Sequence, residues 1–306
     1  KGILSLQKHF HRAEHWVVTH GKPKITLNKK VFVKKPDDAI FIPLGSVHRI
    51  ENPYKKLEQL KKEVINYKRK DGIDLSSIVY TLDTYNPENE GRLPVLMWAY
   101  PREYTSKKVA SQVRNSPYRF TRINYGSPIF WALRGYAVMA STEMPIVGFD
   151  GDQPNNSFRE QLVMNAEAAI DKIVDMGIGD RDRVGVGGHS YGGATATNAA
   201  YNDTRVKACF NLDGWISPLP EEVIKNGIKV PFLFIGRPSW ESSDYPDNYK
   251  RLKVLFDNSQ KPKYRLIFKK TKHLDFTDIP LYSPIVKYVI DVGDIPASKS
   301  TFILNN

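Results

Sequence analysis

The stretch Arg183-Val-Gly-Val-Gly-Gly-His-Ser-Tyr-Gly-Gly193 decides the fold of this chain. It is a short apolar strand that ends in Gly-x-Ser-x-Gly, and the small residues 194–200 that follow favour a helix. A serine that attacks a carbonyl carbon must stand on a sharp turn between strand and helix, where neighbouring side chains would clash. Gly188 and Gly192 remove that clash, and the helix N-terminus behind the turn favours developing negative charge. The pattern predicts that Ser190 is a nucleophile rather than an incidental serine in a glycine-rich loop.

Apolar strands and helical stretches alternate on both sides of this motif. The expected strands lie at 75–81, 93–100, 134–140, 184–186, 206–212, 230–236 and 264–268. Phe158–Met176 has apolar residues at helical spacing, and 285–292 is expected to close the domain as a helix. This alternation predicts the α/β class with a doubly wound, mostly parallel sheet, which is the architecture of the α/β-hydrolase fold.

A serine hydroxyl needs a histidine base, and the histidine needs a carboxylate that orients it. In the α/β-hydrolase order, both groups follow the serine along the chain. His273 is the only histidine after Ser190, and it directly follows the last expected strand, so we expect it to be the base. Asp213 and Asp244 both follow strands at carboxyl ends, where open α/β sheets place their sites. We favour Asp213, because an apolar run precedes it, and we keep Asp244 as the alternative acid.

Two hydrogen-bond donors are expected to hold the oxyanion that forms when a carbonyl is attacked. One is the backbone N–H of Tyr191, the residue after the nucleophile. The other is expected from the loop after the strand that ends at Ala99, where Tyr100 offers its N–H or its hydroxyl. A core tyrosine is the alternative interpretation of Tyr100.

The N-terminal part of the chain differs from the rest in charge and pattern. Residues 1–70 contain 17 Lys and Arg against 6 Asp and Glu, which accounts for +11 of the net charge of +12. Their lysines are scattered pairs without the interleaved aromatic residues that single-stranded nucleic acids require, so we expect no nucleic-acid partner. We expect a small β segment at 1–56, a charged, helix-tolerant connector at 57–70 and the catalytic domain at 71–306.

Composition leaves the cellular compartment open. No apolar run reaches the roughly 18 residues of a membrane span, and no signal-like segment opens the chain as given, so we expect a soluble protein. Cys209 is the single cysteine, which excludes an internal disulfide. Neither the oligomeric state nor the localisation is predicted.

Residues from about 52 to 193 resemble the glutamyl endopeptidase branch of the prolyl oligopeptidase family. The resemblance rests on long matching segments, at 67–73, 93–104, 120–126, 134–138, 144–148 and 165–170. It implies the same α/β-hydrolase fold and a serine peptidase activity. The chain has no room for the β-propeller with which those peptidases screen their substrates.

From about residue 188 to 306 the chain instead resembles platelet-activating factor acetylhydrolases. The likeness is in Gly188–Thr195 and Asn211–Leu219, with further matches at 230–236 and 272–276. In that family the acid ends the strand after the nucleophile helix, which implies Asp213 as the acid and His273 as the base. It also implies a small-molecule or lipid ester as substrate and no cofactor for hydrolysis.

Residues 3–53 resemble the cupin domain of type II phosphomannose isomerases, through the segments Leu4–Trp16 and Ile42–Pro53. Four side chains of these segments offer nitrogen and oxygen ligands for one divalent metal, namely His9, His11, Glu14 and His48. The family's barrel is longer than the matching segment, so the sequence favours a small β appendage over a functional metal site.

These observations together predict a serine esterase of the acetylhydrolase or lipase-like kind, which forms an acyl-enzyme on Ser190. A serine peptidase of the prolyl oligopeptidase type is the first alternative. A non-catalytic, cupin-like protein that binds a metal or a sugar phosphate is the second.

Overall fold

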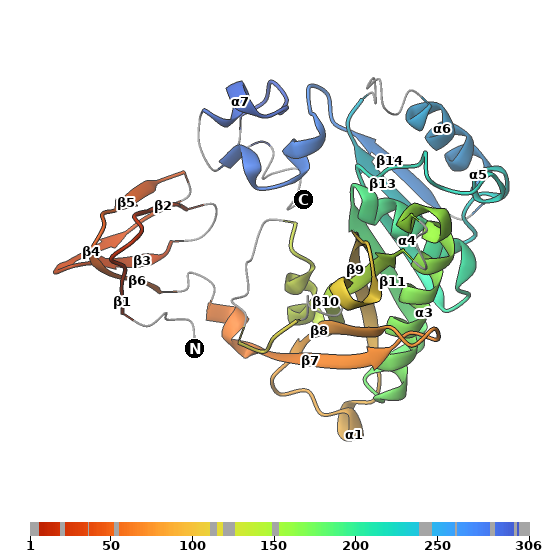
Figure 1. Cartoon of the computed structure of the whole chain (residues 1–306), viewed down its shortest axis with the longest axis horizontal. Coiled ribbons are helices and arrows are strands. Elements are labelled where there is room, and N and C mark those ends of the chain that lie inside the picture. The colour runs from red at the N-terminus through yellow and green to blue at the C-terminus, as the bar shows by residue number, and fades with distance from the viewer. Residues whose placement is uncertain are drawn as a thin grey trace. The chain divides into compact units, whose positions relative to one another are not determined.

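The computed structural model describes residues 6–18, 22–35, 37–51, 55–110, 115–118, 126–148, 153–238, 247–260, 262–281, 285–296 and 299 (Figure 1). The contacts between residues divide the chain into two compact units. The larger unit consists of Lys61–Thr121 and Pro128–His273, and the smaller unit of Lys1–Leu60, Arg122–Ser127 and Leu274–Asn306. This division differs from the boundary that we expected at residue 70.

The larger unit is built on an eight-stranded sheet in the order β14-β13-β12-β11-β9-β10-β8-β7. The strands are β7 (Leu60–Lys68), β8 (Asp74–Leu82), β9 (Leu93–Tyr104), β10 (Ala137–Val147), β11 (Gly179–His189), β12 (Val206–Leu212), β13 (Phe232–Gly236) and β14 (Lys263–Ile267). All neighbours from β14 to β10 pair in parallel, and β10 pairs antiparallel with β8. The predicted α/β class with a mostly parallel sheet is therefore confirmed.

Two helices connect the central strands and cover one face of the sheet. They are α3 (Phe158–Asp175) and α4 (Tyr191–Asn202), which contact each other and both pack on β11 (Figure 1). In α3 most of the predicted apolar positions are buried, among them Leu162 and Ile170, whereas Val163 and Val174 are partly exposed. Shorter helices complete the larger unit, namely α1 (Pro87–Glu90), α2 (Lys107–Ala110), α5 (Glu221–Asn226) and α6 (Asn248–Asn258). The core lies between these helices and the sheet, and it includes Val186 and Phe234.

The connector that we expected at 57–70 is largely a strand. A short 3-10 helix, η1 (Lys55–Gln59), leads into β7, which is an edge strand of the main sheet. Its lysines and glutamates face solvent at an edge, where charged side chains are common because they discourage pairing with another chain. We had given weight to the charges and missed Ile65 and Tyr67, two residues at strand spacing that pack into the core.

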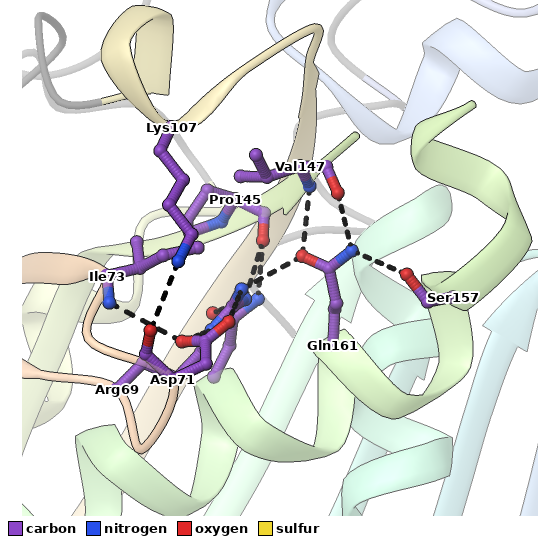
Figure 2. Close-up of polar contacts among 9 residues, drawn as sticks. Arg69, Asp71, Ile73, Lys107, Pro145, Val147, Ser157 and Gln161 are labelled. Carbon is purple, nitrogen blue, oxygen red and sulfur yellow. Dashed lines mark hydrogen bonds and ion pairs between the residues drawn. The ribbon is translucent and has the colours of Figure 1, made fainter. Parts of the chain in front are cut away.

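A buried arginine fastens β7 to α3 at one corner of the sheet (Figure 2). Arg69 is 1% exposed, and its Nε and Nη2 pair with the two carboxylate oxygens of Asp71 at 2.8 Å each. Its remaining N–H groups donate to Gln161 Oε1 at 3.0 Å, Pro145 O at 3.1 Å and Asn165 Oδ1 at 2.9 Å. All five donors of the guanidinium are thus used.

The partners of this arginine continue the network. The Gln161 side chain accepts from Val147 N and donates to Val147 O and Ser157 Oγ (Figure 2). Hydrogen bonds from Arg69 lower the pKa of Asp71, which keeps the carboxylate charged opposite the guanidinium. The cluster ties the ends of β7 and β10 to α3, the helix that packs on the helix after Ser190.

The described residues of the smaller unit form six short strands, and the sequence predicts short strands in this segment. A four-stranded sheet has the order β1-β6-β3-β4, and β2 pairs with β5. The strands are β1 (Gln7–Lys8), β2 (Glu14–Val17), β3 (Lys24–Leu27), β4 (Lys30–Val33), β5 (Ala39–Ile42) and β6 (Val47–Glu51), and every pairing is antiparallel. Ile25 and Ile42 are buried between them. The N-terminal β segment is confirmed.

The C-terminal part of the smaller unit is mostly irregular. Its described elements are the end of the 3-10 helix η4 (His273–Phe276), a second 3-10 helix η5 (Ile279–Leu281) and α7 (Val286–Val289). The closing helix that we expected at 285–292 is thus a single turn. Within the part of the chain that the structure describes, none of the helices combines the length and apolar character needed to span a membrane.

Candidate active site

Ser190 stands on the turn between β11 and α4 with a backbone conformation that few residues adopt. Its φ is 59° and its ψ is −124°, a combination that costs energy for any residue with a side chain. A Cβ on Gly188 would lie 2.2 Å from Gly192 O, and a Cβ on Gly192 would lie 2.3 Å from Ala99 O. Both glycines of the motif are therefore required, and they let the nucleophile turn close against β9.

Backbone hydrogen bonds hold this turn to the neighbouring strand. Ser190 N donates to Leu212 O at 3.0 Å, and Ser190 O accepts from Gly193 N at 2.9 Å and Trp215 N at 3.1 Å. The turn is thus fixed to the carboxyl end of β12, where Asp213 lies. The strained conformation of Ser190 persists because these hydrogen bonds hold both the N–H and the C=O of this residue in place.

The structure brings Ser190, His273 and Asp213 together, although 83 and 60 residues separate the histidine from the other two. His273 Nε2 lies 2.8 Å from Ser190 Oγ, and His273 Nδ1 lies 2.6 Å from Asp213 Oδ2. The Asp213 side chain is fully buried and the His273 side chain is 22% exposed. A carboxylate on Nδ1 leaves Nε2 free to take the serine proton, which is the arrangement that acyl transfer requires.

The carboxylate of Asp213 has a second cationic neighbour. Arg237 Nε lies 3.1 Å from Asp213 Oδ2, the same oxygen that faces His273, and Arg237 N donates to Asp213 Oδ1 at 3.0 Å. The φ of Asp213 is 42°, and its backbone N donates to Ile235 O. A Cβ on Gly236 would lie 2.8 Å from Asp213 Oδ1, so the end of β13 is shaped to admit this carboxylate.

The two residues expected to supply oxyanion donors both lie close to the nucleophile turn. Tyr191 is the first residue of α4, and its ring stacks on Phe158 with centroids 4.8 Å apart. Tyr100 lies within β9, which continues to Tyr104, and not in the loop that we expected after residue 99. Its ring Cδ2 lies 3.5 Å from the position of a Cβ at Gly192, and half of the residue is exposed, so it is not a core tyrosine.

Sequence reasoning missed two residues beside the three. Arg237 directly follows β13, and a charged residue at the carboxyl end of a strand was a signal that we did not use. His189 directly precedes Ser190, and its ring stacks on that of His273. Nothing in the local pattern indicates this stacking, because it joins β11 to the start of η4, 84 positions away. Asp244, the alternative acid, lies outside the described residues.

Three of the four candidate metal ligands converge in the smaller unit. The ligand atoms of His9, Glu14 and His48 all lie within 4.8 Å of one another, whereas His11 is exposed and is not part of this group. His48 Nδ1 donates to Ser46 O at 2.9 Å, and His48 Nε2 is buried without a hydrogen-bond partner among the described residues. Two imidazoles and a carboxylate suit a divalent transition metal.

The side chain of Arg12 contacts two of these three potential metal ligands. Arg12 Nε donates to Glu14 Oε1 at 2.8 Å, and Arg12 Nη2 donates to His9 Nε2 at 2.9 Å. Partial burial raises the pKa of Glu14, but hydrogen bonds from Arg12 and Trp16 outweigh it and lower the pKa below its usual value. The residues fit a divalent metal only if the exposed Arg12 side chain moves away.

Comparisons with known proteins divide the chain along its length. The family model "Mannose-6-phosphate isomerase C-terminal" matches residues 1–75, and "Platelet-activating factor acetylhydrolase, isoform II" matches residues 161–299. A glutamyl endopeptidase of Arabidopsis thaliana, described as probable and chloroplastic, is 40% identical over 170 residues, which are 55% of this chain and 18% of that protein. The platelet-activating factor acetylhydrolase of Canis lupus familiaris is 30% identical over 145 residues, 47% of this chain and 31% of that protein.

A further relative matches the N-terminal part. The alginate biosynthesis protein AlgA of Pseudomonas aeruginosa is 41% identical over 78 residues, 25% of this chain and 16% of that protein. The chain thus spans less than a third of the length of each of these three relatives. All three resemblances that the sequence indicated are confirmed.

Solved structures support the fold of the larger unit. A ferulic acid esterase from Streptomyces cinnamoneus superposes with a TM-score of 0.54 at 17% identity, covering 81% of this chain and 87% of that one. The isopeptidase AtxE2 superposes with a TM-score of 0.53 at 14% identity, covering 91% of this chain and 50% of that one. This chain has the α/β-hydrolase fold, preceded by a β segment similar to the C-terminal domain of mannose-6-phosphate isomerases.

Proposed function

We propose that the larger unit is a serine hydrolase that cleaves carboxylic esters through an acyl-enzyme on Ser190. The observation that carries this proposal is the hydrogen-bonded series from Ser190 Oγ through His273 to Asp213, at 2.8 and 2.6 Å. A strained nucleophile, a base within proton-transfer distance and a buried carboxylate behind it are the three groups that acyl transfer needs.

In the first half of the reaction, Ser190 Oγ attacks the acyl carbon while its proton moves to His273 Nε2. The resulting oxyanion is held by the N–H of Tyr191 and by a donor of Tyr100. The bond from the acyl carbon to the leaving oxygen then breaks, and His273 returns the proton to that oxygen as the alcohol departs. Asp213 keeps the ring oriented and balances its positive charge.

In the second half, a water molecule takes the place of the alcohol. His273 removes a proton from the water as its oxygen attacks the acyl-enzyme. Collapse of the second tetrahedral intermediate releases the carboxylic acid, and the proton passes back to Ser190. No cofactor takes part in these steps.

The substrate class follows from the similar proteins and not from the site alone. Similarity of residues 161–299 to platelet-activating factor acetylhydrolase favours a short-chain or phospholipid-type ester. A small-molecule or lipid ester is therefore the partner that we propose for the larger unit.

An activity-based probe tests the nucleophile directly. A fluorophosphonate forms a covalent bond with an activated serine, so the wild-type chain should be labelled and Ser190→Ala should not. Ser116→Ala removes a serine of the same unit that lies outside the proposed site, and it should be labelled like the wild type. Labelling of Ser190→Ala at the wild-type rate would refute the proposal.

Peptide cleavage after acidic residues is the second candidate, because 170 residues are 40% identical to a glutamyl endopeptidase. It uses the same three groups with an amine as the leaving group. Comparing kcat/KM for p-nitrophenyl acetate with that for a chromogenic peptide ending in Glu separates the two. A higher kcat/KM for the peptide would assign the site to peptidase chemistry.

For the smaller unit we propose weak binding of a divalent metal by His9, Glu14 and His48. The support is the convergence of their ligand atoms and the buried Nε2 of His48, which has no hydrogen-bond partner among the described residues and lies 3.6 Å from Glu14 Oε2. A bound metal would supply a Lewis acid there, and Arg12 would have to leave Glu14. Titration of the metal-free chain with Zn²⁺ or Mn²⁺ by calorimetry tests this, with His48→Ala expected to abolish binding and His11→Ala expected to leave it unchanged.

A further inference from the structure

His189 is the last residue of β11, and its ring lies against the ring of the proposed base, His273. Its ring is nearly parallel to that of His273, with centroids 4.7 Å apart and an angle of 19° between the planes. A hydrogen bond also joins the His189 side chain to the backbone of His273. One residue therefore contacts both the ring and the main chain of the base.

The same strand end supplies both the nucleophile and this contact. Residue 190 is on the strained turn, and residue 189 is still paired in the sheet opposite Leu212. His273 is the first residue of the four-residue 3-10 helix η4, which by itself does little to hold the plane of the imidazole ring. Stacking on a sheet residue supplies that restraint, because aromatic pairs have preferred geometry and a sheet position is rigid.

The charge of His189 suits this position. Burial lowers its pKa to about 4, with the neighbouring charge of His273 acting in the same direction. Arg237 lowers this pKa further, whereas Asp213 and the hydrogen bond to the backbone of His273 raise it. The ring is therefore neutral near pH 7, and it adds no positive charge beside the imidazolium that forms during acyl transfer.

We propose that His189 is a positioning residue for His273, a role that rests on the proposed hydrolase function. Its ring packs on one face of the base and keeps Nε2 directed at Ser190 Oγ. It touches neither the substrate nor the reacting atoms, so its loss should slow acylation and leave substrate binding almost unchanged.

Two variants of similar volume test this role. His189→Leu fills the space without an aromatic face, and His189→Phe keeps the aromatic face. We expect the rate constant of fluorophosphonate labelling and kcat for p-nitrophenyl acetate to fall about 10-fold in His189→Leu, with KM within about 2-fold of the wild type. His189→Phe should recover most of this loss.

Phe210→Leu is the matched control. Phe210 is a half-buried aromatic residue of β12 that contacts Trp98 and pairs in the sheet opposite Gly187. Phe210→Leu also replaces an aromatic residue by leucine, two positions before Leu212, the partner of His189 in the sheet. We expect fluorophosphonate to label this variant at the wild-type rate. Wild-type rates in His189→Leu, or an equal loss in His189→Phe or Phe210→Leu, would overturn the positioning role. Failure of the hydrolase proposal looks different, since the wild-type chain would then show no labelling that depends on Ser190.

Discussion

Two buried charged clusters in the larger unit use the same residue types in opposite ways. Around Arg69, all five guanidinium donors are paired, and its partners Gln161 and Asn165 donate in turn to backbone oxygens of β10. Around Asp213, the backbone is strained at two residues, with φ of 59° at Ser190 and 42° at Asp213. We conclude that a network in which every hydrogen-bond donor is paired holds helices and strands together, whereas a site that carries out chemistry retains backbone strain.

The clusters also differ in how their carboxylates are shared. Asp71 binds one edge of a single arginine with both oxygens, Oδ1 to Nε and Oδ2 to Nη2 of Arg69. Asp213 Oδ2 is shared between His273 and Arg237, and the imidazole beyond it faces a serine hydroxyl. In the second cluster a proton can therefore move between Ser190 Oγ and His273 Nε2, whereas the first cluster has a purely structural arrangement.

The largest expected effect comes from removing the charge of Asp213. The same change at Asp71 and at Asp244 provides the comparison. Asp213→Asn should lower kcat for p-nitrophenyl acetate by about 10³–10⁴-fold, because an amide can hold His273 in the wrong tautomer. Asp71→Asn should leave kcat per folded molecule unchanged and lower only the midpoint of unfolding. Asp244→Asn should cause a smaller loss than Asp213→Asn. The reverse order of these two variants would move the assignment of the acid.

Breaking the structural cluster should affect stability and not chemistry. Arg69→Met leaves Gln161, Asn165 and Asp71 without their shared cation, so we expect the free energy of unfolding to fall by about 3–5 kcal/mol. Urea denaturation measures this, and Arg102→Met, at an exposed position of β9, is the control. A loss below about 1 kcal/mol would show that the network contributes little to the fold.

Acid should destabilise the fold through His189. Its pKa is about 4 in the folded chain and about 6.5 when unfolded, so between these values the unfolded chain binds more protons. Stability contributed by its neutral form is therefore complete above pH 7 and is lost as pH falls from about 6.5 to 4, by about 2–3 kcal/mol. His273, Asp213 and Arg237 face this ring.

The measurement is the difference between wild-type and His189→Phe unfolding free energies over pH 4–8. We expect the variant to lose less stability on acidification. Parallel curves for the two proteins would contradict the assignment of this titration to His189.

The smallest effect is expected at Arg237, because its backbone N–H still donates to Asp213 Oδ1 after the side chain is changed. Arg237→Met should lower kcat about 10-fold, which is about 1.4 kcal/mol. Arg237→Lys keeps the positive charge near Asp213 Oδ2 and should restore part of the loss. An unchanged kcat in Arg237→Met would show that the ion pair at 3.1 Å does not help to position the carboxylate.

Much of the fold was predictable from the sequence because its signals are local. The apolar runs that form β9 to β14 and the helical spacing of α3 can be read within windows of 5–18 residues. The β7 edge strand was missed, because its lysines and glutamates are typical of exposed helices as well as of edge strands. The full extent of β9 to Tyr104 was also missed, since Pro101 reads as the end of a strand.

By itself, the sequence determined which serine stands on the strained turn, because the two glycines that this turn needs are its chain neighbours. It also narrowed the base to one histidine, and it favoured Asp213 over Asp244 as the acid, first because an apolar run precedes Asp213 and then through a family resemblance. Only the tertiary structure placed Arg237 and His189 beside these groups and excluded His11 from the cluster of His9, Glu14 and His48. The physical reason is the separation along the sequence over which each signal acts. Backbone strain and periodicity depend on residues that are adjacent or a few positions apart. An ion pair or a ring stack joins distant positions that only the folded sheet brings together.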